Sequence, residues 1–253
     1  MSEKKSLIER YRRLYKFHKS AEDVYSKKAQ ARLIAHLYQK YGRGNAHTLL
    51  DIGCGNGLLL SELKGKYKLT GLDINKKCIN ESKRYVKRAS FVLGNMLDFK
   101  FDQTYNIITC FDAIDHGSDL RKGIRKTLAN AHRHLTLGGL LIFTMPLARE
   151  TWENGQSSAD ELSVSDERYI RIHHKYVDRY RLKSCMAVVL IKGNKISTEF
   201  KIYEMKGRML RTLDVAKIAQ KLGFRVHIFT EKGNKPWTSK SDDIPLFVCV
   251  KKS

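Results

Sequence analysis

Short apolar segments alternate with amphipathic stretches through the middle of the chain, between residues 47 and 146. Apolar runs of this length are typical of buried strands, and the stretches between them carry apolar residues at the three- and four-residue steps of a helix. This alternation predicts a parallel sheet covered by helices on both faces. The predicted strands are Thr48–Ile52, Lys68–Asp73, Phe91–Leu93, Tyr105–Phe111 and Leu140–Pro146, and the predicted helices between them are Asn56–Lys64, Lys76–Val86 and Leu120–Leu135.

The residues before this region predict helix. Apolar side chains recur at three- and four-residue steps over residues 5–42, and Gly42 and Gly44 then end the segment. We therefore interpret residues 1–46 as an N-terminal helical cap and residues 47–253 as the main domain.

The pattern changes after Pro146. Residues 148–168 are polar and rich in Ser, Asp and Glu, which predicts a long loop or lid. Residues 182–191 and 196–203 flank a turn sequence that contains Gly193 and Asn194, and they predict an antiparallel hairpin. We therefore expect an insertion over residues 147–210.

A helix and two strands complete the pattern. The helix is predicted from Thr212 to Leu222, with Thr212 or Asp214 as its cap, and the strands are Arg225–Thr230 and Leu246–Lys251. The predicted fold is therefore α/β: a Rossmann-like, doubly wound, mostly parallel seven-stranded sheet with an inserted antiparallel hairpin.

Composition narrows the class of protein. The 253 residues are 42% hydrophobic, enough for a sizeable core, yet runs such as Met186–Ile191 are far shorter than the roughly 18 to 20 residues that cross a bilayer. The first residues lack an apolar signal region, so we expect a soluble, cytoplasmic protein. Five widely spread cysteines predict reduced, buried thiols and no metal site.

The net charge of +22 predicts attraction to polyanions such as nucleic acid. The basic residues are spread along the chain, and no recognisable nucleic-acid-binding module accompanies them. Solvated helix faces explain the same charge, so both interpretations stay open.

A glycine-rich turn, Gly53-Cys54-Gly55-Asn56-Gly57, stands directly between a predicted buried strand that ends in Asp51-Ile52 and a predicted helix. Glycine positions let the backbone approach a ligand closely, and amide groups at the following helix start can face it. The G-x-G-x-G spacing differs from the G-x-G-x-x-G that cradles a pyrophosphate, which suits a cofactor without phosphate. Asp73 ends the second strand, where ribose hydroxyls need an acceptor.

These motifs resemble class I S-adenosylmethionine-dependent methyltransferases over most of residues 47–146. The resemblance implies S-adenosyl-L-methionine as cofactor and S-adenosyl-L-homocysteine as product. It implies that the methionine portion is held by the first-strand acid and the turn, and the nucleoside by the second-strand end. The residues carried over are Asp51, Gly53, Cys54, Gly55 and Gly57 for the methionine end, Asp73 for the ribose and Ile74 for the adenine.

Two later motifs extend the resemblance. The family often has Gly-Asp after its third strand, whereas this chain has Gly94-Asn95-Met96, so Asn95 would accept the adenine amino group without charge and Met96 would cover the ring. Asn95 as a plain turn residue is the alternative. The fourth-strand motif places the Cys110 carbonyl toward the cofactor and Asp112 near its sulfonium, and a family element with Gly138-Gly139 predicts a turn before the fifth strand.

Methyl transfer depends mainly on positioning, so few catalytic side chains are expected. An ammonium or hydroxyl acceptor must lose a proton, and His116, after the fourth strand, is the candidate base. A structural role for His116 is the alternative.

The acceptor remains open among three interpretations. The fourth-strand form and the later insertion resemble small-molecule N- or O-methyltransferases, whereas the Asp/Asn-Pro-Pro-Tyr/Phe motif of base-methylating enzymes is missing. An RNA methyltransferase is supported by charge alone. A non-catalytic S-adenosylmethionine-binding partner subunit is the third interpretation, and each of the three is compatible with an oligomer.

Overall fold

The structure is a computed structural model, and it describes residues 21–114, 120–145, 157–164, 167–177, 181–206, 210–231, 233, 235–239 and 244–252. Within these ranges no helix has the length and apolar character that crossing a bilayer requires.

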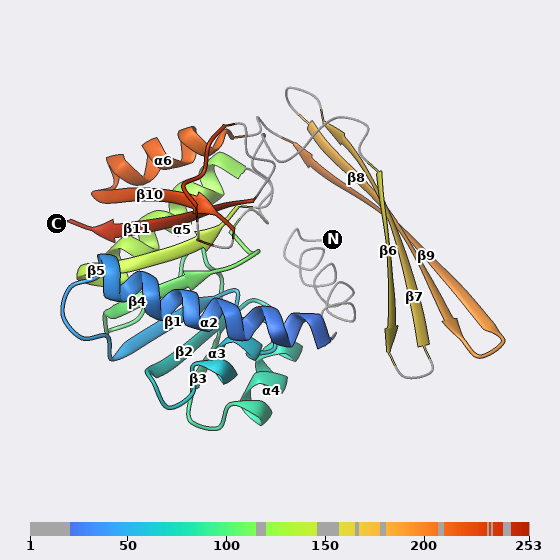
Figure 1. Cartoon of the computed structure of the whole chain (residues 1–253), viewed down its shortest axis with the longest axis horizontal. Coiled ribbons are helices and arrows are strands. Elements are labelled where there is room, and N and C mark those ends of the chain that lie inside the picture. Colours follow the sequence, from blue (N-terminus) through green and yellow to red (C-terminus); the bar gives the residue numbers. More distant parts are fainter. Residues whose placement is uncertain are drawn as a thin grey trace.

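A seven-stranded sheet forms the centre of the molecule (Figure 1). Its order is β10-β11-β5-β4-β1-β2-β3, and every pair is parallel except the two that involve β11. The predicted mostly parallel seven-stranded sheet is therefore confirmed. Its strands are β1 (Thr48–Ile52), β2 (Lys68–Asp73), β3 (Ser90–Leu93), β4 (Tyr105–Cys110), β5 (Leu135–Thr144), β10 (Phe224–Thr230) and β11 (Pro245–Lys251).

Helices cover both faces of this sheet, because neighbouring residues of each buried strand point to opposite sides. Leu49 of β1 packs with the helices α2 (Ala21–Tyr41), α3 (Leu58–Glu62) and α4 (Lys76–Tyr85). Leu50 packs on the other side with α5 (Leu120–His134) and α6 (Thr212–Lys221). The sheet is thus doubly wound, as predicted.

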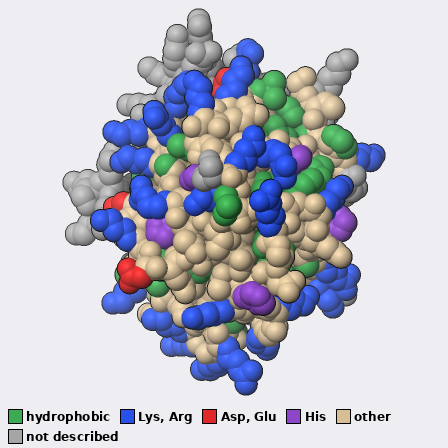
Figure 2. Space-filling view, turned by 90° about the vertical axis from the view of Figure 1, so that its left-hand side faces the viewer, with side chains coloured by type: hydrophobic (Ala, Val, Ile, Leu, Met, Phe, Trp, Pro, Cys, Tyr) green, Lys and Arg blue, Asp and Glu red, His purple; other side chains and the backbone are tan. Residues whose placement is uncertain are grey.

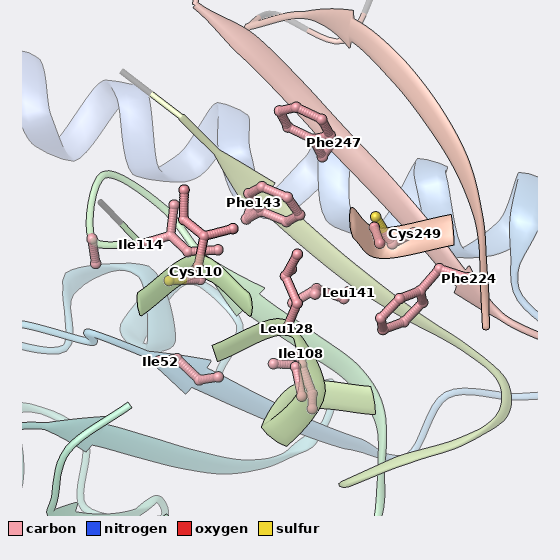
Figure 3. Close-up of a cluster of buried hydrophobic side chains, with 14 of the residues drawn as sticks. Ile52, Ile108, Cys110, Ile114, Leu128, Leu141, Phe143, Phe224, Phe247 and Cys249 are labelled. Carbon is pink, nitrogen blue, oxygen red and sulfur yellow. The ribbon is translucent and has the colours of Figure 1, made fainter. Parts of the chain in front are cut away.

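The buried hydrophobic side chains on the Leu50 side of the sheet form a densely packed cluster (Figure 3). The rings of Phe143 on β5 and Phe247 on β11 stack with centroids 4.5 Å apart. Since these two residues are register partners on antiparallel strands, their stacking joins the last strand to the parallel part of the sheet. Four of the five cysteines are free and buried, as expected: Cys54, Cys78, Cys110 and Cys249.

The insertion contains more regular secondary structure than predicted. It is a four-stranded antiparallel sheet made of β6 (Ser157–Val164), β7 (Glu167–Val177), β8 (Arg181–Lys192) and β9 (Lys195–Lys206). The hairpin prediction is confirmed by β8 and β9, but the loop prediction for 148–168 is wrong over β6 and the start of β7. β6 lacks the apolar alternation of a half-buried strand, and its backbone pairs along its full length with β7. Figure 1 shows this sheet as a unit separate from the seven-stranded sheet.

Three smaller predictions are corrected. Gly138 and Gly139 lie inside β5 rather than in a turn before it, next to an irregularity in the register with β4. The N-cap of α6 is Arg211 rather than Thr212 or Asp214; Thr212 is the first helical residue, and Asp214 in the first turn accepts the Arg211 amide at 3.4 Å. The predicted helix from Asn56 is confined to α3, because Gly57 adopts a left-handed conformation.

Candidate functional site

The glycine loop lies at the carboxyl edge of the sheet, where β1 ends. The amides of Gly53 and Cys54 donate to the carbonyl of Leu72 on β2, at 2.7 and 3.1 Å. Gly53 has φ +73°, and a Cβ there would lie 2.5 Å from the Cβ of Ala113. A side chain at Gly53 is therefore excluded both by backbone conformation and by the segment after β4.

Gly55 is held on two sides while its Cα faces open space. Its amide donates to Oδ2 of Asp73 at 2.8 Å, and its carbonyl accepts from Oγ of Ser82 on α4 at 2.9 Å. It has φ +53°, and nothing lies within 4 Å of an added Cβ. A ligand can therefore approach the backbone closely at Gly55.

Both carboxylate oxygens of Asp73 accept hydrogen bonds from backbone amides. Oδ2 accepts the Gly55 amide, and Oδ1 accepts the Asn75 amide at 2.8 Å. A carboxylate accepts hydrogen bonds from hydroxyl as well as amide donors, and this one stands at the carboxyl end of β2. The side chain predicted to bind ribose thus also shapes the turn, and Ile74 beside it is half-buried.

Asp51 is buried beneath the loop. The Thr109 hydroxyl on β4 donates to its Oδ1 at 2.7 Å. Loss of solvation raises the pKa of Asp51 to about 7, against the opposing effects of the Thr109 bond and the positive charge of Lys27 on α2. Asp51 therefore titrates near neutral pH and responds to any positive charge placed beside it.

A cavity of about 50 Å³ opens next to this carboxyl group. Its polar lining comes from Lys27, Asp51, Asn56 and the loop backbone, and Phe111 and two leucines of α3 supply the apolar wall. An ammonium suits the Asp51 side and a carboxylate suits the Lys27 side. The volume accepts a small zwitterionic group such as an amino-acid head.

The segment after β3 carries Asn95 and Met96, both half-buried. Oδ1 of Asn95 accepts the Leu97 amide at 3.0 Å, so this side chain stabilises a turn, which was the alternative interpretation. Met96 packs against the buried cluster on the Leu50 side of the sheet. Its Cε lies 4.0 Å from a Cβ built at Gly53. These positions are compatible with an adenine edge beside the turn, which stays a prediction.

The end of β4 has an unusual backbone. Cys110 is its last residue and is fully buried, whereas Asp112 is exposed and adopts φ +54°. Thr144 of β5 holds this conformation, because its hydroxyl accepts the Asp112 amide at 2.9 Å and donates to Oδ1 at 3.0 Å. Strained conformations of this kind are concentrated at functional sites.

The structure thus brings most predicted site residues to one edge of the sheet. His116 lies outside the described residues. Four contributors were missed by sequence reasoning: Lys27, Ser82, Thr109 and Thr144. Ser82 alone had a signal, since it lies four residues after Cys78 on the buried face of α4.

These residues fit S-adenosylmethionine. The cavity between Asp51 and Lys27 matches an amino-acid head, the open approach at Gly55 matches a ligand lying along the backbone, and the carboxylate of Asp73 beside Gly55 is the acceptor type that hydroxyls need. No pyrophosphate cradle is needed for such a ligand.

Comparison with known protein families also indicates a methyltransferase. A family described as "Methyltransferase domain" matches residues 25–188, which is more than half of the chain. The chain belongs to this methyltransferase-domain family. The matched residues run from α2 into β8 and include the whole edge described above.

Among curated relatives, this methyltransferase-domain protein is 26% identical over 153 residues to a malonyl-[acyl-carrier protein] O-methyltransferase of Bacillus anthracis, over 57% of this chain and 55% of the relative. It is 28% identical over 98 residues to dTDP-4-amino-2,3,4,6-tetradeoxy-D-glucose N,N-dimethyltransferase of Saccharopolyspora spinosa, over 38% and 39% of the two chains. The chain thus spans about half or less of the length of these relatives.

Solved structures share the fold. CalS10, an amino pentose methyltransferase from Micromonospora echinaspora whose structure holds S-adenosylmethionine, superposes with a TM-score of 0.77 at 16% identity, over 96% of both chains. DesVI of Streptomyces venezuelae gives 0.74 at 18% identity, over 92% of this chain and 98% of its own. These two alignments each cover more than nine tenths of this chain.

Proposed function

We propose that this protein is an S-adenosylmethionine-dependent methyltransferase that methylates a nitrogen or oxygen atom of a small molecule. The observation that carries the proposal is the arrangement at Gly55, whose amide is fixed to Asp73 while its Cα faces open space. Open space alone does not distinguish a site, since Gly44 has it too, but at Gly55 it lies beside the carboxylate of Asp73 and next to the cavity lined by Asp51 and Lys27.

Each part of the proposed site binds one part of the cofactor. Asp51 accepts the methionine ammonium, and Lys27 pairs with its carboxylate across the small cavity. Asp73 accepts the ribose hydroxyls with its carboxylate oxygens. Ile74, Asn95 and Met96 border the adenine, and the glycines and Cys54 keep the loop backbone close to the ligand.

The chain contributes positioning more than chemistry. When bound, S-adenosylmethionine supplies an electrophilic methyl group on a sulfonium. The ends of β1 and β4 orient that end of the site, and Thr144 fixes Asp112 at its mouth. We assign proton removal from the acceptor to His116, which follows this segment in the sequence, because imidazole is the usual general base of proteins.

The acceptor class rests on two supports. The relatives named above act, by their names, on an acyl group carried by a protein and on an amino sugar nucleotide. The structural relatives include an amino pentose methyltransferase. We therefore place the acceptor among small molecules with an amine or a hydroxyl, and RNA is the competing acceptor, supported by the net charge of +22.

The decisive experiment uses S-adenosylmethionine with a labelled methyl group and cell lysate separated into RNA, protein and small molecules. Label confined to the small-molecule fraction supports the proposal, whereas label in RNA alone overturns the acceptor class. The Asp73→Ala variant is the control for cofactor-dependent labelling. Cofactor binding without label in any fraction, together with a copurifying partner, supports a non-catalytic subunit instead.

His116→Ala should lower turnover and leave cofactor affinity unchanged, and an unchanged rate overturns its role.

We further propose that residues 1–46 form a helical cap, that 147–210 are an insertion in a 47–253 domain, and that the protein is cytoplasmic. The close packing of α2 against α3 supports the cap. Deleting residues 147–210 across a short linker should preserve cofactor binding if the domain boundaries are right. Cell fractionation tests the location, and light scattering gives the oligomeric state.

A further inference from the structure

A second cavity lies at the opposite edge of the sheet, among the amino ends of β1, β2 and β3. Its volume is about 290 Å³, larger than that of the cavity beside Asp51. His47, which precedes β1, lines it, whereas the glycine loop follows the last residue of β1. Since strands rise about 3.3 Å per residue, five residues place the two cavities roughly 16 Å apart. A ligand here lies outside the proposed methyl-transfer site.

The lining of this amino-edge cavity is strongly basic. Four exposed basic side chains and His47 surround it, and no acidic residue is among its lining residues in the described part of the chain. Figure 2 looks onto this edge of the sheet, where Lys and Arg side chains far outnumber Asp and Glu. Like charges around one cavity repel each other, so a bound anion lowers the energy of the arrangement. The four are Lys64, Lys66, Lys68 and Arg88.

Three separate connections build the rim, and hydrogen bonds fix the backbone of the two that precede β1 and β2. The Lys68 amide donates to the His47 carbonyl at 2.7 Å, which ties the start of β2 to the start of β1. The His47 amide donates to Oδ1 of Asn106 on β4 at 2.9 Å. The Lys66 amide closes the turn after α3 on the Leu63 carbonyl at 3.1 Å. The backbone at these positions therefore needs no ordering when a ligand binds, which lowers the cost of binding.

The inner wall of the cavity is apolar. Leu69 and Val86 are buried in the core, and the half-buried ring of Tyr67 packs against the same cluster. Burial raises the pKa of the Tyr67 hydroxyl, so this group stays a neutral donor. The cavity therefore combines cations at its rim with an aromatic ring inside.

We propose that the amino-edge cavity binds a small phosphate-bearing ligand, with its phosphate between Lys64, Lys68 and Arg88 and its attached group against Tyr67. Ligand cavities typically start at about 300 Å³, so the volume suits a phosphate with a small attached group. A nucleic-acid strand needs a continuous basic track, whereas these cations converge on one cavity.

Calorimetry at 150 mM NaCl tests this proposal with pyrophosphate, uridine diphosphate and uridine as probes. These probes carry no adenine, which keeps them distinct from the nucleoside site at Asp73. The intact protein should bind both phosphate compounds and show no binding of uridine. Tighter binding of uridine diphosphate than of pyrophosphate assigns the site to phosphate esters, and equal binding assigns it to the free inorganic anion.

The triple variant K64Q/K68Q/R88Q should bind uridine diphosphate at least tenfold more weakly. The matched control is R121Q/R125Q/K126Q, which removes the same charge from the exposed face of α5 and should change affinity less than twofold. Equal weakening in both variants, or no binding by the intact protein, overturns the proposal. Tight binding of oligouridylate with no binding of uridine diphosphate overturns it in favour of RNA. Both variants should keep their S-adenosylmethionine affinity and melting temperature, so this test is independent of the methyltransferase proposal.

Discussion

The hydroxyl of Thr109 donates a hydrogen bond of 2.7 Å to Oδ1 of Asp51, and the two residues are register partners on the neighbouring parallel strands β4 and β1. This contact satisfies one oxygen of a carboxyl group that is otherwise removed from water. It does not compensate for the lost solvation, and the pKa of Asp51 rises from 3.8 to about 7. The carboxyl group is consequently protonated in the folded protein under mildly acidic conditions.

The first prediction concerns stability and pH. Because the folded pKa of Asp51 lies above its unfolded value, its contribution is most favourable at low pH and is lost as pH rises through about 7. Between pH 5 and pH 8.5 the protein should lose about 3 kcal/mol more than the Asp51→Asn variant. Urea unfolding of both proteins at the two pH values measures this difference, and identical pH dependence contradicts it.

The second prediction concerns Asp73. Asp73→Ala removes the acceptor for the Gly55 amide and the proposed acceptor for ribose, so S-adenosylmethionine affinity should fall by one to about 3 kcal/mol. Asp73→Asn keeps one acceptor oxygen and should show a smaller loss. Calorimetry measures both, with Asp98→Ala, an exposed acid nearby, as the control. Unchanged affinity in Asp73→Ala contradicts the assignment.

The third prediction separates backbone strain from ligand approach. Gly55 and Gly44 both have positive φ and open space at the Cβ position, so an alanine at either should cost about 1 to 2 kcal/mol of stability. Gly55→Ala should in addition abolish cofactor binding, because its methyl group occupies the proposed path of the ligand. Gly44→Ala lies at the other edge of the sheet and should leave binding intact. Equal S-adenosylmethionine affinities of Gly55→Ala and Gly44→Ala contradict the proposed path of the cofactor along the loop.

The fourth prediction concerns Ser82, whose hydroxyl shares its proton between the carbonyls of Gly55 and Cys78, both at 2.9 Å. Ser82→Ala should reduce stability by about 1 kcal/mol and weaken cofactor binding several-fold, since one support of the loop is lost. Ser61→Ala removes a comparable bond of 2.7 Å that stays within α3. If the two variants bind the cofactor equally, Ser82 does not support the site.

The fifth prediction concerns Lys27. Lys27→Gln should weaken S-adenosylmethionine about tenfold or more, because it removes the charge that faces the proposed carboxylate position. Lys28→Gln removes the same charge from the exposed side of the same helix and serves as the control. Calorimetry with methylthioadenosine, which lacks the amino-acid end, should show no difference between Lys27→Gln and the unaltered protein.

Sequence patterns predicted the seven-stranded sheet because its strands are continuous apolar runs such as Thr48–Ile52 that have few alternative structures. They failed for β6, whose polar sequence forms a strand only through its pairing with β7. The glycine loop and Asp73 were readable because their chemistry is local in the chain. Lys27 and Thr109 were not, because they reach Asp51 only through packing across the sheet.

The position of β11 has a consequence for how the protein is made. β11 lies between β5 and β10, although it is the last strand in the sequence. During synthesis, Phe143 and the adjoining edge of β5 have no partner while about 100 further residues are added, and contacts of such long separation form slowly. The nascent chain therefore presents an unpaired apolar strand edge throughout this interval, and such an edge is a template for aggregation.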